Sequence, residues 1–197
     1  MRKRQYFFTT GRGQSLIEFA LVLPLALLIV LGVVEVGMML LDEHVVTRLS
    51  REGSNLISRD TPLETAAEVM TSMSARPVDF SNGSKVIFTV LKRGATSGTA
   101  NYDRLVMYQR AEFGNFSGPG VSRVQSAGGA IGGPPDYKAA NSDNDAGLRV
   151  TGVPANLVTA PGGMVYITEI FTRRLRLTPL DRFGVSVPET LYSIAYF

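Results

Sequence analysis

Glu18 is the residue whose chemistry most needs an explanation, because it is an acid at the start of a long apolar run. From Phe19 to Leu41 the chain has 23 residues, of which only Glu35 is ionisable. An unpaired charge at membrane depth costs free energy, so the Glu18 carboxylate either stays among lipid headgroups or forms an ion pair. For Glu35, near the far end of the run, the alternatives are partial solvation and an assembly contact.

Residue patterns typical of enzymes and metal sites are missing from the sequence. The chain has no Cys, which excludes zinc–thiolate sites and thiol nucleophiles, and its single histidine, His44, is interpreted as an interfacial polar residue. No serine-hydrolase elbow, zinc-protease or phosphate-loop motif occurs. The segment Asn141–Gly147 resembles a calcium loop only superficially, because Gly152 occupies the twelfth position, where Glu is needed. We expect no enzymatic activity, no cofactor and no metal.

The apolar run predicts a membrane-spanning helix. At roughly 1.5 Å per residue, it spans about 34 Å, enough for a hydrocarbon core of about 30 Å. Asp42–His44 follows it, without the small-residue cleavage site of a secretory signal, so we expect the span to be retained. Pro24 lies inside the span and predicts either a tolerated kink or a hinge for packing.

The basic residues near the span predict its direction. Four of them precede it: Arg2, Lys3, Arg4 and Arg12. By the positive-inside rule the N-terminus is cytoplasmic and residues 42–197 lie outside. Without these four, 16 basic residues face 17 acidic ones, so the charge distribution argues against nucleic acid as a partner.

The rest of the chain predicts an α+β fold, in which a helical stalk carries a small head. The apolar periodicity continues past the membrane, so we expect one helix from about Ser15 to Ser58. A second helix is expected at TPLE, with Thr61 as N-cap, Pro62 as first helical residue and Glu64 as capping-box partner. Its apolar side would be Leu63, Ala66, Ala67, Met70 and Met73, and Pro77 would end it.

Four segments rich in Val, Ile, Tyr, Phe and Thr predict strands of an antiparallel sheet. They are Lys85–Leu91, Leu105–Phe113, Met164–Thr172 and Leu191–Phe197, and Leu148–Val150 is a candidate start of another. The segment over about 114–147 is rich in Gly, Pro and polar residues, which predicts a flexible loop.

The stretch GRG–QSLIE–FALVLP resembles the leader and processing site of type IV pilin-like proteins. In those proteins prepilin peptidase cuts after a glycine at the cytoplasmic face, and a glutamate becomes the fifth residue of the mature chain. The resemblance implies a cut between Gly13 and Gln14, with Glu18 fifth. The earlier Gly11 would place Glu18 seventh and fits worse.

A larger set of residues resembles the TadE-like family, minor pseudopilins of the tight-adherence (Tad, Flp; type IVb) pilus. The set is Gly13–Gln14, Glu18–Phe19, Pro24, Gly32–Gly37 and Arg51–Glu52–Gly53. It covers about the first 55 residues; the remainder is less similar, and His44–Thr47 departs from the more Ala- and Asn-rich run of many members.

The family resemblance implies three parts. They are a basic leader over 1–13, a transmembrane and stalk helix over 14–58, and a periplasmic α+β domain over 59–197. The protein would be a minor pilin-like subunit or assembly factor in the bacterial inner membrane, with prepilin peptidase and other pilin-like subunits as partners. Glu18, Phe19, Pro24 and Glu35 would serve assembly, and Glu18 would pair with the new α-amino group of a neighbouring chain.

Two other functions remain open at this stage. One is a single-pass, membrane-anchored periplasmic binding protein whose leader stays intact. The other is a membrane-tethered hydrolase, which the lone His44 and the missing catalytic motifs disfavour.

Overall fold

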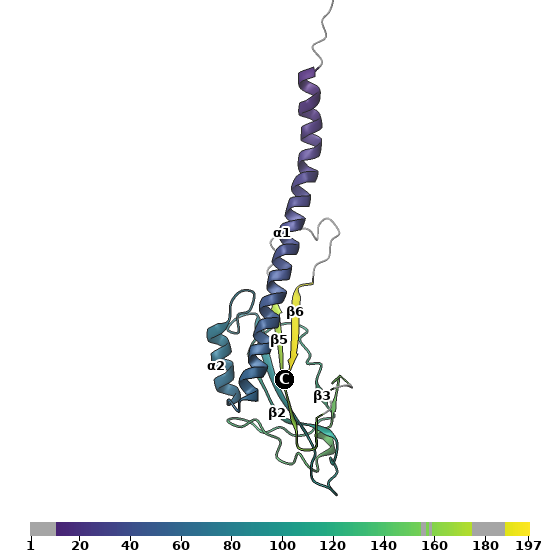
Figure 1. Ribbon diagram of the computed structural model, residues 1–197. Coiled ribbons are helices and arrows are strands. Elements are labelled where there is room, and N and C mark those ends of the chain that lie inside the picture. Colours follow the sequence, from purple (N-terminus) through teal and green to yellow (C-terminus); the bar gives the residue numbers. More distant parts are fainter. Residues whose placement is uncertain (1–10, 155–156, 158, 175–187) are drawn as a thin grey trace, which may run out of the picture. The chain divides into compact units, whose positions relative to one another are not determined.

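The computed structural model describes residues 11–154, 157, 159–174 and 188–197, and begins with a long helix (Figure 1). This helix, α1, covers Gly11–Ser58 without a break, so the single helix expected from about Ser15 to Ser58 is confirmed. The chain divides into two compact units, and the boundary lies inside α1, after Leu40. The residues of α1 from Leu41 onward belong to the α+β unit, called the head below.

The head contains a four-stranded sheet, as the sequence predicts. Its strands are β1 (Ser84–Arg93), β2 (Leu105–Asn115), β5 (Met164–Arg173) and β6 (Thr190–Tyr196). The order is β2-β1-β5-β6, and every neighbouring pair is antiparallel. The candidate strand at Leu148–Val150 is wrong in part, because Ala146–Leu148 forms a 3-10 helix, η1, and strand β4 covers Val150–Thr151. Strand β4 pairs with β3 (Gln125–Ser126).

The second helix, α2, covers Leu63–Met73 and starts one residue later than expected. Pro62 is its N-cap in an extended conformation with ψ 141°, so Glu64 stands one position too early to close a capping box. Glu64 instead accepts a hydrogen bond from the Tyr137 hydroxyl at 2.9 Å.

The end and the apolar side of α2 also differ from the expectation. Helix α2 ends before Pro77, where Thr71, Ser72 and Ser74 donate their hydroxyls to carbonyls of the last turns. Four of its five expected apolar contacts are buried, namely Leu63, Ala66, Ala67 and Met70. The fifth, Met73, is 44% exposed because it lies at the end of the last turn.

The sheet has a buried cluster on each face, so three layers build the head. One cluster joins residues of α1 and α2 to the sheet through Val86, Phe88, Val90 and Ile170. The other joins Leu91, Met107, Val165 and Ile167 to Val124, Ala139 and Leu148, which lie outside the sheet. The segment expected to be a flexible loop thus supplies much of the second layer, although most of it has no regular structure.

Close contacts fix α1 on the helix-covered face. Ser50 Oγ lies 2.9 Å from Ser193 Oγ, and Ser54 Oγ donates to the carbonyl of Ala195 at 3.0 Å, so β6 is tied to the helix. One helical turn away, a Cβ built on Gly53 would lie 2.7 Å from both Met70 Sδ and Thr168 Cγ2. The absence of a side chain at Gly53 therefore sets how closely α1 approaches α2 and β5.

Gly53→Ala should destabilise the head by about 1–2 kcal/mol, because overpacking costs ~1–3 kcal/mol and the better helix propensity of Ala offsets part of it. Thermal unfolding of the full chain in detergent measures this change. Gly37→Ala is the matched control in the same helix, because a Cβ there meets nothing within 4 Å. Equal melting temperatures for Gly53→Ala and the wild type would contradict the close-packing account.

Candidate assembly and processing site

The expected processing site lies in the first turns of α1. Gly13 and Gln14 are helical and exposed, and a Cβ built on Gly13 would meet nothing within 4 Å. The peptide bond between Gly13 and Gln14 therefore joins two exposed residues of α1.

Glu18 is exposed and forms a hydrogen bond one turn along the same helix. Gln14 Nε2 donates to Glu18 Oε1 at 3.0 Å. Residues four apart are neighbours on a helix surface, so this pair follows from the spacing. The Gln14 amide is neutral. It therefore orients the Glu18 carboxylate but does not neutralise its charge.

The rest of the apolar run leaves its side chains uncovered. Phe19 is 63% exposed, and Pro24 is accommodated within the continuous helix. Large apolar side chains are exposed along this part of the helix, including Leu21, Leu25, Ile29, Val33, Val36 and Leu40. Within the part of the chain that the structure describes, α1 is the one helix long and apolar enough to cross a membrane.

Glu35 differs from the residues around it because its side chain is only 3% exposed. Leu28, Gly32 and Met39 are partly buried, and their spacing from Glu35 places all four on one face of α1. The side chains of the apolar run are therefore of two kinds. Most are exposed, whereas those on the narrow face that contains Glu35 are buried or partly buried.

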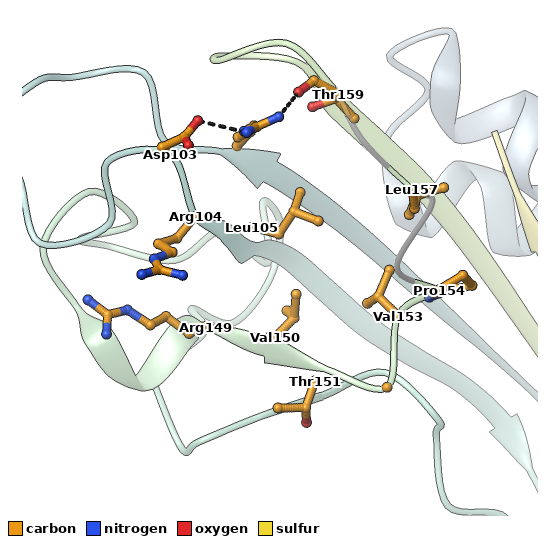
Figure 2. Close-up of a pocket in the computed structure, with 12 residues that line it drawn as sticks. Asp103, Arg104, Leu105, Arg149, Val150, Thr151, Val153, Pro154, Leu157 and Thr159 are labelled. Atoms are coloured by element: carbon orange, nitrogen blue, oxygen red, sulfur yellow. Dashed lines mark hydrogen bonds and ion pairs between the residues drawn. The ribbon is translucent and has the colours of Figure 1, made fainter.

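A cleft of about 600 Å³ in the head was not predicted from the sequence (Figure 2). It is lined by Arg93 at the end of β1, Arg104 just before β2 and Arg149 just before β4. These arginines are far apart in the sequence and carry no motif. A bridge between Val106 and Arg149 brings the start of β2 to the start of β4 and so assembles the cleft.

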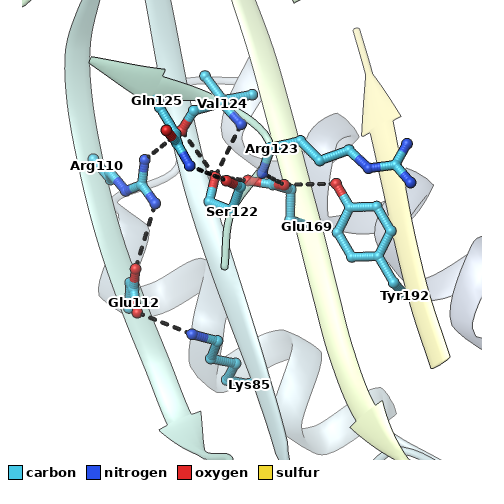
Figure 3. Close-up of polar contacts among 9 residues, drawn as sticks. All are labelled: Lys85, Arg110, Glu112, Ser122, Arg123, Val124, Gln125, Glu169 and Tyr192. Carbon is cyan, nitrogen blue, oxygen red and sulfur yellow. Dashed lines mark hydrogen bonds and ion pairs between the residues drawn. The ribbon is translucent and has the colours of Figure 1, made fainter. Parts of the chain in front are cut away.

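A buried carboxylate, Glu169, was also missed by the sequence analysis (Figure 3). It accepts hydrogen bonds from the Ser122 hydroxyl, from the backbone amide of Arg123 at 2.9 Å and from the Tyr192 hydroxyl at 2.6 Å. The guanidinium of Arg123 lies 4.8 Å from the centre of the Tyr192 ring. This cluster attaches the loop before β3 to β5 and β6 and is explained by its structural role.

Comparison with known proteins gives one match. The family model described as TadE-like protein matches residues 13–55, which is the segment that carries the resemblance seen in the sequence. The match confirms that resemblance and relates this segment to pilin-like proteins of the Tad pilus. It includes Gly13, Glu18 and the close-packed Gly53. No curated protein and no solved structure matches the chain.

The Glu169 cluster predicts how the head responds to alkaline pH. Burial raises the pKa of Tyr192 above its usual value, and the hydrogen bond to Glu169 raises it further. The folded state therefore keeps this proton to higher pH than the unfolded chain, so the stability it contributes is complete below pH about 10 and is lost as the pH rises above that.

Tyr192→Phe should lower the melting temperature at pH about 8, because the hydrogen bond to Glu169 is lost. Its melting temperature should then fall less steeply than that of the wild type between pH about 9.5 and 11. Tyr102→Phe is the control, because Tyr102 is 47% exposed and should keep the wild-type slope. Parallel curves for Tyr192→Phe and the wild type would contradict the assignment.

Proposed function

We propose that this protein is a minor pilin-like subunit or assembly factor of a Tad-type pilus, processed by prepilin peptidase. The observation that carries the proposal is the exposed apolar surface of α1 with the Glu18 carboxylate at its start, within the segment matched by the TadE-like family model. An apolar surface of this extent has to be covered by lipid or by other helices. The protein would act by helix packing and contacts of the head, without catalysis.

The proposed topology places the protein in the bacterial inner membrane. The four basic residues before the span would stay in the cytoplasm, and the head would lie in the periplasm. Prepilin peptidase then meets the Gly13–Gln14 bond at the cytoplasmic face.

The proposed role of Glu18 is to set the register between neighbouring chains. Cleavage after Gly13 would make the backbone nitrogen of Gln14 a cationic α-amino group. The Gln14 side chain occupies Oε1 of Glu18, so the carboxylate is held in place while Oε2 can accept from the amino group of a neighbour. Between parallel helices in an apolar bundle, the two charges would neutralise each other only at one axial offset.

The processing step predicts a specific effect of substitution at Gly13. Gly13→Leu should leave the leader attached, because the peptidase must approach the backbone closely at this position. Intact mass spectrometry of chain purified from native membranes measures the loss of residues 1–13. Gly11→Leu is the matched control and should still be processed. Wild-type protein that retains Met1 or Arg2 would refute the proposal and favour an anchored binding protein with an intact leader.

The pairing role predicts that Glu18→Gln separates membrane insertion from assembly. Insertion should persist, because removing a charge eases burial, while the unpaired amino group of the neighbour costs about 3 kcal/mol in the bundle. We expect a processed, stable variant that crosslinks poorly to other pilin-like subunits and gives fewer pili at matched protein level.

Glu43→Gln removes an exposed acid just beyond the apolar run and is the control. It should leave crosslinking and filament number unchanged. Normal piliation by a processed and abundant Glu18→Gln variant would exclude charge pairing, although the family relationship would stand.

A further inference from the structure

We propose that the cleft between the starts of β2 and β4 binds an oxyanion, namely a carboxylate, sulfate or phosphate group, through Arg104 and Arg149. The inference rests on the head alone and is independent of processing and assembly. It concerns the cleft drawn in Figure 2, whose charged lining residues are Arg93, Asp103, Arg104 and Arg149.

The cleft carries more positive charge than its own acid can compensate. Arg93 lies 2.8 Å from Asp103 and also donates to the carbonyl of Thr159, so this pair is internally satisfied. Another acid of the head, Asp143, lies 3.8 Å from Lys92. Arg104 and Arg149 have no carboxylate partner among the described residues. The charges of Arg104 and Arg149 are therefore not compensated within the cleft, although the chain apart from its basic leader is close to neutral.

Arg149 is held in position by neutral groups. Its Nε donates to Asn101 Oδ1 at 3.0 Å, and its Nη2 donates to the carbonyl of Ala100 at 2.6 Å. Asn101 is fully buried, and its amide nitrogen donates to the carbonyls of Ser142 and Asp145, which fixes the amide orientation. The guanidinium is thus oriented without losing its charge, and three of its five N–H groups remain for a ligand.

Arg104 is placed opposite Arg149 by a tightly closed loop. The Arg104 carbonyl accepts from the amide of Gly94 at 3.0 Å, and Asp103 beside it adopts a left-handed backbone with φ 59°. A Cβ on Gly94 would lie 2.0 Å from the carbonyl oxygen of Asn101, so this closure requires glycine. Figure 2 shows the guanidinium groups of Arg104 and Arg149 facing each other.

Two facing guanidinium groups repel each other, and an oxyanion between them turns the repulsion into two charge-assisted contacts. Leu105, Val150 and Val153 supply an apolar wall in the same cleft. A volume of about 600 Å³ is typical of small-molecule sites. The geometry therefore favours an organic anion, with its charged group at the two arginines and its apolar part against this wall.

Titration of the full chain in zwitterionic detergent tests the proposal. The probes are sodium phosphate, sodium sulfate, sodium butyrate and butyl phosphate, at constant ionic strength set with sodium chloride. We expect saturable calorimetric or NMR binding of butyl phosphate with a Kd of about 1 mM or below, and weaker binding of inorganic phosphate. Arg104→Gln and Arg149→Gln should each weaken binding at least about tenfold.

Arg76→Gln is the matched control, because Arg76 is exposed and outside the cleft. It should bind the probes as the wild type does, and all variants are compared after thermal unfolding has shown that they are folded. No saturable binding by the wild type would overturn the proposal, as would an equal loss of affinity in Arg76→Gln. Equal affinity for butyl phosphate and inorganic phosphate would overturn the role of the apolar wall.

Discussion

The structure depends on one helix that satisfies two different surroundings. Up to Leu40 the apolar side chains of α1 cannot remain in water, whereas from Val46 onward its apolar residues are buried by the head's own sheet and second helix. A helix pairs all of its interior backbone groups within itself, so the backbone can pass from one surrounding to the other without a break. The close packing of the second half of α1 against the head also explains the glycine at position 53. There the helix is packed against protein, and a side chain at that position would meet the core of the head.

Sequence reasoning predicted the elements whose signal is local and periodic. The long helix and the four long strands were placed to within a few residues, because apolar periodicity and Gly or Pro boundaries determine them. The start of α2 was misplaced by one residue, since the backbone angle of Pro62 decides it and composition does not. The burial of Val124 and Ala139 was not predicted, because isolated apolar residues in a Gly- and Pro-rich segment show no helical or strand periodicity. The cleft and the Glu169 cluster were missed because they join residues that only the sheet topology brings together.

The charged side chains discussed above differ in how completely other groups of the same chain compensate their charge. Glu169 accepts three hydrogen bonds and is buried, as expected for a carboxylate that fixes a fold. Glu18, Arg104 and Arg149 are exposed, and the hydrogen-bond partners of Glu18 and Arg149 are neutral groups. Charges that are oriented but not compensated within the chain are suited to meeting a partner from outside. This contrast marks the start of α1 and the arginine cleft as the two candidate functional regions.

The contacts between α1 and β6 also govern when the head can be completed during synthesis. Ser50 and Ser193 are 143 residues apart in the chain, and Ser54 and Ala195 are 141 apart. Contacts of such long separation carry the entropy of closing most of the chain, and they form late in folding. The apolar span emerges from the ribosome before the sheet does, and the surface of α1 that receives β6 stays open until β6 itself has been made. The sheet of the head therefore closes only after β6 has been made, on a helix that has already emerged.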